Sequence, residues 1–132
     1  MPNKIRVMTN AAAPAMGTYS QAIRTGDLVF VNAQTGRNES GELEEGLEAQ
    51  THQMLANVEA ILNAAGCSPA DIVKVTMLFA DIKDFKAVDA IYAKWLPGIG
   101  ITALPARTAF AVAGLPHGAL VMIDVVAAFP TE

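Results

Sequence analysis

Hydrophobic and polar positions follow two different periods along this chain. From Leu47 to Ala65 the apolar residues recur at steps of three and four, and Gly66 follows as a C-terminal cap. This spacing is typical of an α-helix with one buried face. A second stripe at helical spacing runs from Phe85 to Trp95, and the sequence Leu96–Gly100 then breaks the helix. The pattern predicts two amphipathic helices.

The other apolar runs are short and are bounded by turn residues, which is typical of β-strands. We expect strands over Tyr19–Arg24, Leu28–Asn32, Ile72–Ala80, Thr108–Ala113 and Leu120–Phe129. A Gly-containing loop separates the first two strands, and the turn from Gly114 to Gly118 separates the last two, so we expect a hairpin at each place. Residues 5–17 are predicted to form an ordered but irregular arm.

The elements follow the order β-β-α-β-α-β-β within one domain, residues 1–132. This order predicts an α+β fold in which two helices cover one face of a sheet. The last strand is apolar on both sides apart from Asp124. We therefore expect a second copy of the chain to cover the other face.

Composition supports an oligomer and limits the class of ligand. The chain is 52% hydrophobic and only 17% charged, which is rich in apolar residues for a small monomer. Its net charge of −4 disfavours non-specific nucleic-acid binding. One cysteine, no long apolar segment and no apolar signal core after Met1 predict a cytoplasmic protein without a membrane span.

Arg107 is the single formally charged residue between Trp95 and Ile123. A guanidinium keeps its charge, so in apolar surroundings it needs an anion or access to water. Its planar fork of donors fits a carboxylate. That carboxylate could belong to a ligand, to Asp124 on the last strand, or to another subunit.

Several short motifs in one order resemble the RidA/YjgF/UK114 family of reactive-intermediate deaminases. The resemblance runs nearly end to end and is carried by Ala13–Ala15, Gly17–Ala22, Leu28–Val31, Gln34, Gly36, Gln50, Asn57, Ala64–Gly66, Val73–Thr76, Asp84–Phe85, Tyr92, Pro105–Arg107 and Leu115–Pro116. It implies a chorismate-mutase-like homotrimer with sites between subunits. It also implies hydrolysis of 2-aminoacrylate or 2-iminopropionate to a 2-oxo acid and ammonia, without a cofactor.

The resemblance also implies roles for individual residues. Arg107 would bind the substrate carboxylate, Tyr19 would line the site, and the loop with Ala33 and Gln34 would approach the ligand through its backbone. Met122 stands where family deaminases have a glutamate that positions water. A thioether cannot accept or deliver a proton, so we expect slower turnover.

Other interpretations of these residues remain open. Met122 could simply be a wall or core residue, and Tyr19 could be a strand aromatic with its hydroxyl in water. The histidines, His52 and His117, lack metal-ligand spacing, so no metal site is expected. A non-catalytic binder of small 2-oxo acids is a second hypothesis, motivated by Met122. An endoribonuclease is a remote third.

Overall fold

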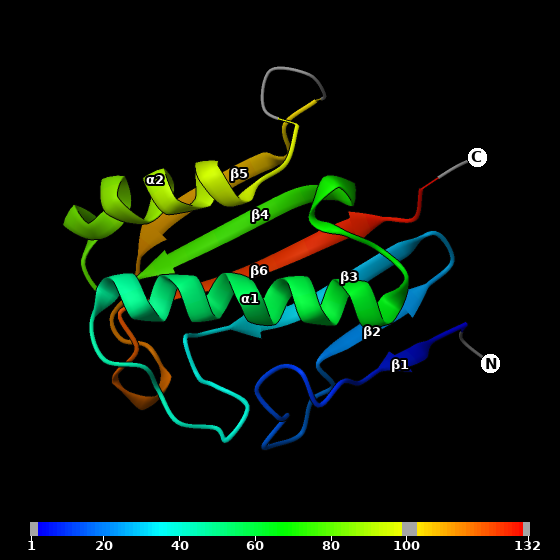
Figure 1. Cartoon of the computed structure of the whole chain (residues 1–132), viewed down its shortest axis with the longest axis horizontal. Coiled ribbons are helices and arrows are strands. Elements are labelled where there is room, and N and C mark those ends of the chain that lie inside the picture. Colours follow the sequence, from blue (N-terminus) through cyan, green and yellow to red (C-terminus); the bar gives the residue numbers. More distant parts are fainter. Residues whose placement is uncertain (1–2, 99–102, 131–132) are drawn as a thin grey trace.

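The chain forms one mixed sheet with helices on one of its faces, seen in a computed structural model that describes residues 3–98 and 103–130 (Figure 1). The elements are β1 (Ile5–Val7), β2 (Ala22–Thr25), β3 (Leu28–Gln34), α1 (Leu47–Ala65), η1 (Pro69–Asp71), β4 (Ile72–Phe79), η2 (Ile82–Asp84), α2 (Phe85–Trp95), β5 (Ala106–Ala111), η3 (Pro116–Gly118) and β6 (Val121–Ala128), where η denotes a single 3-10 turn.

Both predicted helices are present. The face of α1 that carries Met54, Val58 and Ile61 is fully buried against the sheet, as the apolar spacing requires. Gly66 ends this helix in the left-handed conformation, with φ 91°, which only glycine adopts without strain. The helix α2 begins and ends at the predicted residues, so the helical part of the fold is confirmed.

The order of the strands differs from the predicted hairpins at the C-terminal end. The described strands form one sheet in the order β1-β2-β3-β6-β4-β5. Strand β6 pairs antiparallel with both β3 and β4, while β5 pairs parallel with β4 at the edge. The predicted hairpin of the last two strands is therefore wrong. A strand that is apolar on both sides is best buried at the centre, between two neighbours.

The N-terminal arm also departs from the prediction. Ile5–Val7 forms β1 beside β2, where irregular structure was expected. Further along the arm, the buried Gln21 side chain accepts a hydrogen bond from the Thr9 amide and donates to the Thr9 and Ala13 carbonyls. One amide side chain thus satisfies several backbone groups that the short strand leaves unpaired.

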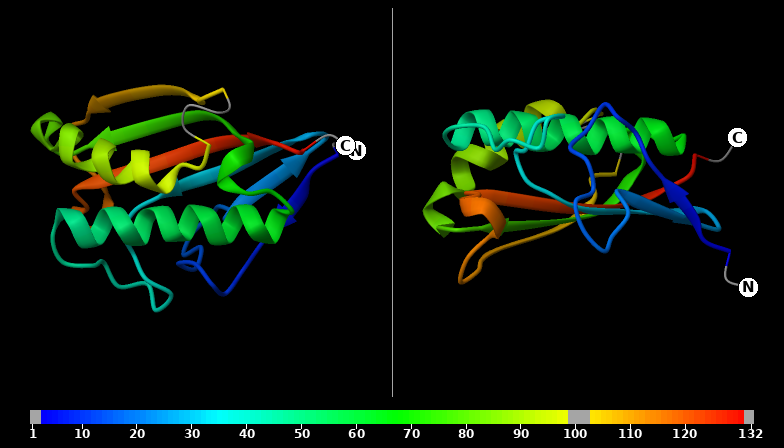
Figure 2. Two further views of the ribbon diagram at one scale, coloured as in Figure 1. Left: turned by 45° about the horizontal axis from the view of Figure 1, so that its top comes forward. Right: turned by 90° about the horizontal axis from the view of Figure 1, so that it is seen from below.

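The described helices cover only one of the two faces of the sheet. Both helices lie on one face, and the described residues place no helix on the other (Figure 2). This second face, which we call the open face, is mainly apolar. Its central and outer positions, as the strand register assigns them, are Leu28, Phe30, Lys74, Thr76, Leu78, Thr108, Phe110, Met122, Asp124 and Val126. Phe30 and Phe110 are each 45% exposed.

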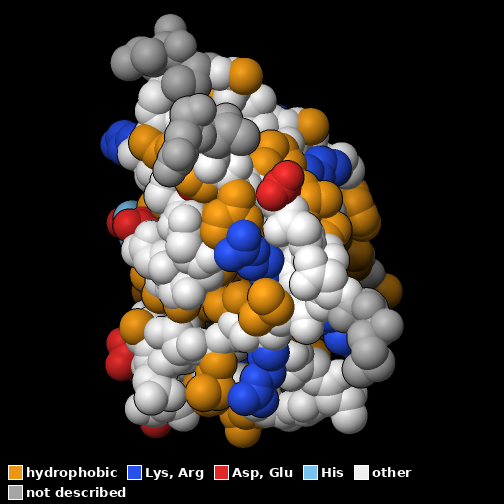
Figure 3. Space-filling model, turned by 90° about the vertical axis from the view of Figure 1, so that its right-hand side faces the viewer, with side chains coloured by type: hydrophobic (Ala, Val, Ile, Leu, Met, Phe, Trp, Pro, Cys, Tyr) orange, Lys and Arg blue, Asp and Glu red, His pale blue; other side chains and the backbone are white. Residues whose placement is uncertain are grey.

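Hydrophobic side chains are also exposed at the end of the molecule where the termini lie, among several Lys and Arg side chains (Figure 3). The predicted helix break at Leu96–Gly100 lies partly outside the described residues, but α2 ends before it, at Trp95. Neither described helix combines the length and apolarity that a membrane crossing needs.

Candidate functional site

Arg107 lies on the edge strand β5 and points to the helix-covered face of the sheet. Its register partner on β4 is Val75, which is fully buried under the helices. The guanidinium carbon lies 4.9 Å from the centre of the Phe85 ring on α2. Its Nη1 donates to Oδ1 of Asp89 at 2.6 Å. The arginine is therefore held by one aromatic face and one carboxylate of the same helix.

The ion pair with Asp89 corrects the expectations for Arg107. Asp124, the acid nearest in sequence, cannot pair with it, because β4 separates β5 from β6. Asp124 is also opposite Thr76, the neighbour of Val75, so it points to the open face. The chain itself supplies an anion to Arg107. This anion, Asp89, lies on α2, and its distance along the sequence gave no indication of the contact.

The Arg107–Asp89 pair is not sealed in the core. The side chain of Arg107 is 37% exposed and that of Asp89 is 34% exposed. Both line a cavity of about 400 Å³ together with Tyr92, Leu96 and Leu104. Burial raises the pKa of the Tyr92 hydroxyl above its usual range, against the opposing effect of Arg107. The cavity therefore presents one cation and one anion on apolar walls.

The other predicted site residues surround a different cavity. Tyr19, Ala33, Gln34 and Met122 all line a space of about 360 Å³. A register shift between Val31 and Gln34 interrupts the pairing of β3 with β6 at Asn32 and Ala33, and the pairing resumes at Gln34. The structure thus brings four of the five predicted residues together and places Arg107 elsewhere.

Tyr19 is anchored in this cavity. Its hydroxyl accepts hydrogen bonds from the Met16 amide at 3.1 Å and from Nη2 of Arg37 at 3.5 Å. Arg37 also donates to the Pro14 carbonyl at 3.0 Å. The tyrosine hydroxyl is therefore held by the protein, although the residue is 40% exposed.

The loop after β3 is fixed from below by α1. Gln34 is buried, and its Nε2 donates to the Asn32 carbonyl at 3.0 Å. A Cβ atom on Gly36 would lie 2.4 Å from the Gln50 Cα, so only glycine lets the loop approach the helix this closely. This close contact positions the flanking residues that line the cavity, Thr35 and Arg37.

The two groups of residues are too far apart to act together within one chain. Met122 is opposite Leu78 on β4, and Leu78 is opposite Phe110 on β5. Phe110 lies three positions beyond Arg107, about 10 Å along the strand, and two strand spacings add about 10 Å across the sheet. Met122 and Arg107 also point to opposite faces. A small substrate cannot touch both in one subunit.

Other titratable groups near the site have structural explanations. Burial raises the pKa of Asp124 on the open face, while Lys74 and the Thr76 hydroxyl oppose the shift. Away from the site, burial also raises the pKa of the Cys67 thiol, which is the state of a small buried residue and not of a reactive nucleophile. His117 is exposed and also lines the Met122 cavity from η3, with φ 60°.

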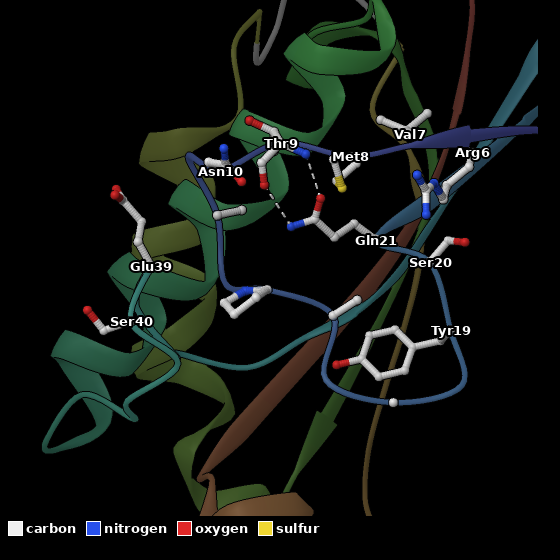
Figure 4. Close-up of a pocket in the computed structure, with 14 residues that line it drawn as sticks. Arg6, Val7, Met8, Thr9, Asn10, Tyr19, Ser20, Gln21, Glu39 and Ser40 are labelled. Atoms are coloured by element: carbon white, nitrogen blue, oxygen red, sulfur yellow. Dashed lines mark hydrogen bonds between the residues drawn. The ribbon is translucent and has the colours of Figure 1, made fainter.

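A larger cavity of about 620 Å³ lies beneath the N-terminal arm (Figure 4). Tyr19 stands at one side of it, and the Gln21 side chain crosses it to Thr9. The amide oxygen and nitrogen of the Gln21 side chain are both hydrogen-bonded to the backbone of the arm. We therefore interpret this cavity as a result of the way the arm is attached. Among the described residues no group of His, Cys, Asp and Glu could hold a metal ion.

Comparison with known proteins identifies the relatives of this fold and site. The sequence model of Endoribonuclease L-PSP matches residues 9–129. The chain belongs to the Endoribonuclease L-PSP family. Its similarity to RidA/YjgF proteins is confirmed as well: the YjgF gene product of E. coli superimposes with a TM-score of 0.87 at 34% identity, covering 94% of this chain and 98% of that one.

Other relatives of this chain carry deaminase names. The human protein called 2-iminobutanoate/2-iminopropanoate deaminase is 40% identical over 125 residues, which is 92% of this chain and 88% of the relative. Reactive Intermediate Deaminase A, chloroplastic, of Arabidopsis thaliana is 42% identical over 123 residues, or 92% of this chain. The chain spans 64% of that relative's length. A Rid-family protein of Yersinia pestis superimposes with a TM-score of 0.89 at 38% identity, covering 95% and 98% of the two chains.

Sequence reasoning missed Asp89 as the partner of Arg107. A signal was present, because Phe85, Asp89 and Tyr92 share one face of α2 at helical spacing. A carboxylate on an otherwise apolar stripe indicates a buried or half-buried cation opposite it. The strand that faces α2, however, could not be identified from the sequence.

Proposed function

We propose that this chain hydrolyses small 2-imino acids to 2-oxo acids and ammonia, at a site completed between two copies of the chain. The observation that carries this proposal is the separation of Arg107 from the Tyr19–Met122 cavity on opposite faces of one sheet. The deaminase names of relatives that align over 92% of the chain supply the reaction class.

In this proposal each half of the site has its own task. Arg107 of one copy binds the carboxylate of the substrate through its fork of donors. In the other copy, the loop with Ala33 and Gln34 shapes the cavity, and Tyr19 closes it. An imine carbon is already electrophilic, so holding the substrate beside a water molecule accelerates hydrolysis without a metal or cofactor.

The partner that fits the open face is another copy of this chain. The face is mainly apolar, with Phe30 and Phe110 exposed. Contact between two different surfaces is heterologous and forms a ring when the rotation between copies closes, and the family resemblance implies a ring of three. The net charge of −4 argues against RNA as the substrate. The buried free thiol of Cys67 suits the reducing cytoplasm, the compartment we propose.

Met122 favours a second candidate function, binding of small 2-oxo acids without turnover. No proton acceptor stands at that position, and general acid or base catalysis typically contributes about 10²–10⁴-fold. Both candidate functions use Arg107 to bind a carboxylate, but only the deaminase converts its ligand.

A deamination assay on freshly generated 2-iminopropionate, with pyruvate calorimetry in parallel, tests both functions. We expect measurable turnover in the parent protein and at least a roughly 100-fold loss in Arg107→Ala, because one charge-assisted bidentate contact disappears. Pyruvate binding without turnover would favour the binder. Equal turnover in parent and Arg107→Ala would overturn the deaminase proposal.

A further inference from the structure

The carboxylate of Asp89 accepts a hydrogen bond from Arg107 through only one of its two oxygens. Oδ1 of Asp89 accepts from Nη1 of Arg107 at 2.6 Å. Within residues 3–98 and 103–130, the Asp89 side chain makes no other hydrogen bond or ion pair. Its side chain is 34% exposed and lines the same cavity as Arg107. The second carboxylate oxygen, Oδ2, is therefore available to a ligand that reaches Arg107.

The charges of this cavity select between kinds of ligand. A ligand with only a carboxylate is attracted by Arg107 but repelled by Asp89, since both carboxylates would lie within a few ångströms of one guanidinium. A ligand that carries a cationic nitrogen next to its carboxylate meets an opposite charge at each end. A protonated 2-imino acid has this pattern, and the corresponding 2-oxo acid does not.

We propose that Asp89 recognises the protonated nitrogen of the imine substrate and disfavours the 2-oxo acid product. This inference rests on the proposed deaminase function. In the reaction, R–C(=NH2⁺)–COO⁻ and water give R–CO–COO⁻ and NH4⁺: the C–O bonds form to water oxygen, and the C–N bond breaks. The nitrogen leaves with the positive charge, so the product loses its attraction to Asp89 at the moment the reaction is complete.

The environment of Asp89 fits selective recognition better than a sealed structural pair. The Phe85 ring already supports the guanidinium from one side, at 4.9 Å. Tyr92, Leu96 and Leu104 line the cavity with apolar groups, and the exposure of Arg107 and Asp89 leaves both charges within reach of a ligand. Arg107 is thus positioned partly without Asp89, and the carboxylate is left free to discriminate between ligands.

Asp89→Asn tests this inference, since asparagine has the same shape and can still accept from Arg107 but carries no charge. The probes are two stable ligands of similar size: L-alanine, which carries an ammonium group, and pyruvate. In Asp89→Asn we expect calorimetry to show pyruvate binding about tenfold tighter and L-alanine about tenfold weaker than in the parent. The kcat/KM for 2-iminopropionate should fall in parallel. Glu48→Gln, on a side chain that is 84% exposed, removes one negative charge elsewhere and should change neither ligand.

The recognition role is supported if Asp89→Asn binds pyruvate more tightly and L-alanine more weakly than the parent does. It is overturned if the affinities of both ligands change in the same direction. Tighter binding of both would make Asp89 only a competitor for Arg107, and weaker binding of both would make it only a support. Unchanged binding would leave it without a role. A melting curve shows whether Asp89→Asn is folded, and Asp89→Ser provides a smaller uncharged variant.

Failure of the deaminase function is separable from failure of this inference. If the parent does not turn over 2-iminopropionate but Asp89→Asn reverses the ligand preference, the deaminase proposal fails and the recognition role stands. If turnover is normal and the preference is the same in both proteins, the recognition role fails alone. If neither ligand binds the parent or Asp89→Asn, the recognition role is wrong, and the turnover assay alone decides the deaminase function.

Discussion

The Arg107 region and the Met122 cavity each contain an arginine but hold its charge in different ways. The first lies under α2 and has a cation, a carboxylate and apolar walls. The second lies at the end of β3 and has an anchored tyrosine hydroxyl, a thioether and the guanidinium of Arg37. In the first region the cation is paired with a carboxylate, and in the second it donates to a hydroxyl and a backbone carbonyl. Neither is a complete site for an imino acid, so we expect the two to meet only when copies of the chain associate.

The largest expected effect is the recovery of activity when two inactive variants, one altered in each region, are mixed. Arg107→Ala and the cavity-filling variant Ala33→Trp should each lose activity at least roughly 100-fold as pure proteins. In a mixture refolded at equal amounts, about one site in four combines an intact arginine with an intact cavity, if the assembly is a ring. The deaminase assay should then recover about a quarter of the parent rate.

The control for mixing is Arg107→Ala refolded with itself, which should stay inactive. No recovery in the mixed sample, with both variants folded and associated, would show that the two regions do not share one site.

The next largest effect concerns the missing proton acceptor. Met122→Glu places a carboxylate on the cavity wall, and we expect kcat for 2-iminopropionate to rise up to about 10²-fold. Met122→Gln has similar size without the charge and should leave kcat near the parent value. If both variants gain equally, polarity rather than acid–base chemistry limits the parent.

The loop beside the Met122 cavity should be more sensitive to packing than the turn before η3. Gly36→Ala forces a Cβ against Gln50 at 2.4 Å, and the backbone there has little room to move. We expect a loss of about 2 kcal/mol in the free energy of unfolding, measured by urea denaturation. Gly114→Ala is the matched control, because nothing lies within 4 Å of the added Cβ. Equal stability of the two variants would mean that the loop is not fixed by α1.

The smallest expected effect is the change in stability caused by replacing Asp124 on the open face. Burial raises the pKa of Asp124 in the folded state, so the fold binds a proton more tightly than the unfolded chain. Its contribution is most favourable below the unfolded pKa and is lost as pH rises through the folded pKa. Asp124→Asn should therefore stabilise the protein at pH 7, by less than about 1 kcal/mol because solvent screens a half-buried group. The gain should vanish in melting curves at acid pH, and a gain that grows there would contradict this account.

The predicted site shows how far sequence reasoning reached. Tyr19, Ala33, Gln34 and Met122 were grouped by resemblance, and they do line one cavity. Arg107 was singled out as the residue that needs an anion, and the chain itself supplies one. Its actual partner, Asp89, was missed because the pairing depends on α2 lying over β5, a contact between elements rather than a pattern within one.

Local periodicity determined the helices, the ends of α1 and the strands from β2 onward, because the side chains of one element repeat every 3.6 or 2 residues whatever surrounds them. Only the tertiary structure decided that β6 enters the middle of the sheet and leaves β5 at its edge. That order puts β4 between Arg107 and Met122, and their register with β4 points them to opposite faces. Neighbours across a sheet are selected by which surfaces bury each other best, and spacing along one chain does not contain that information.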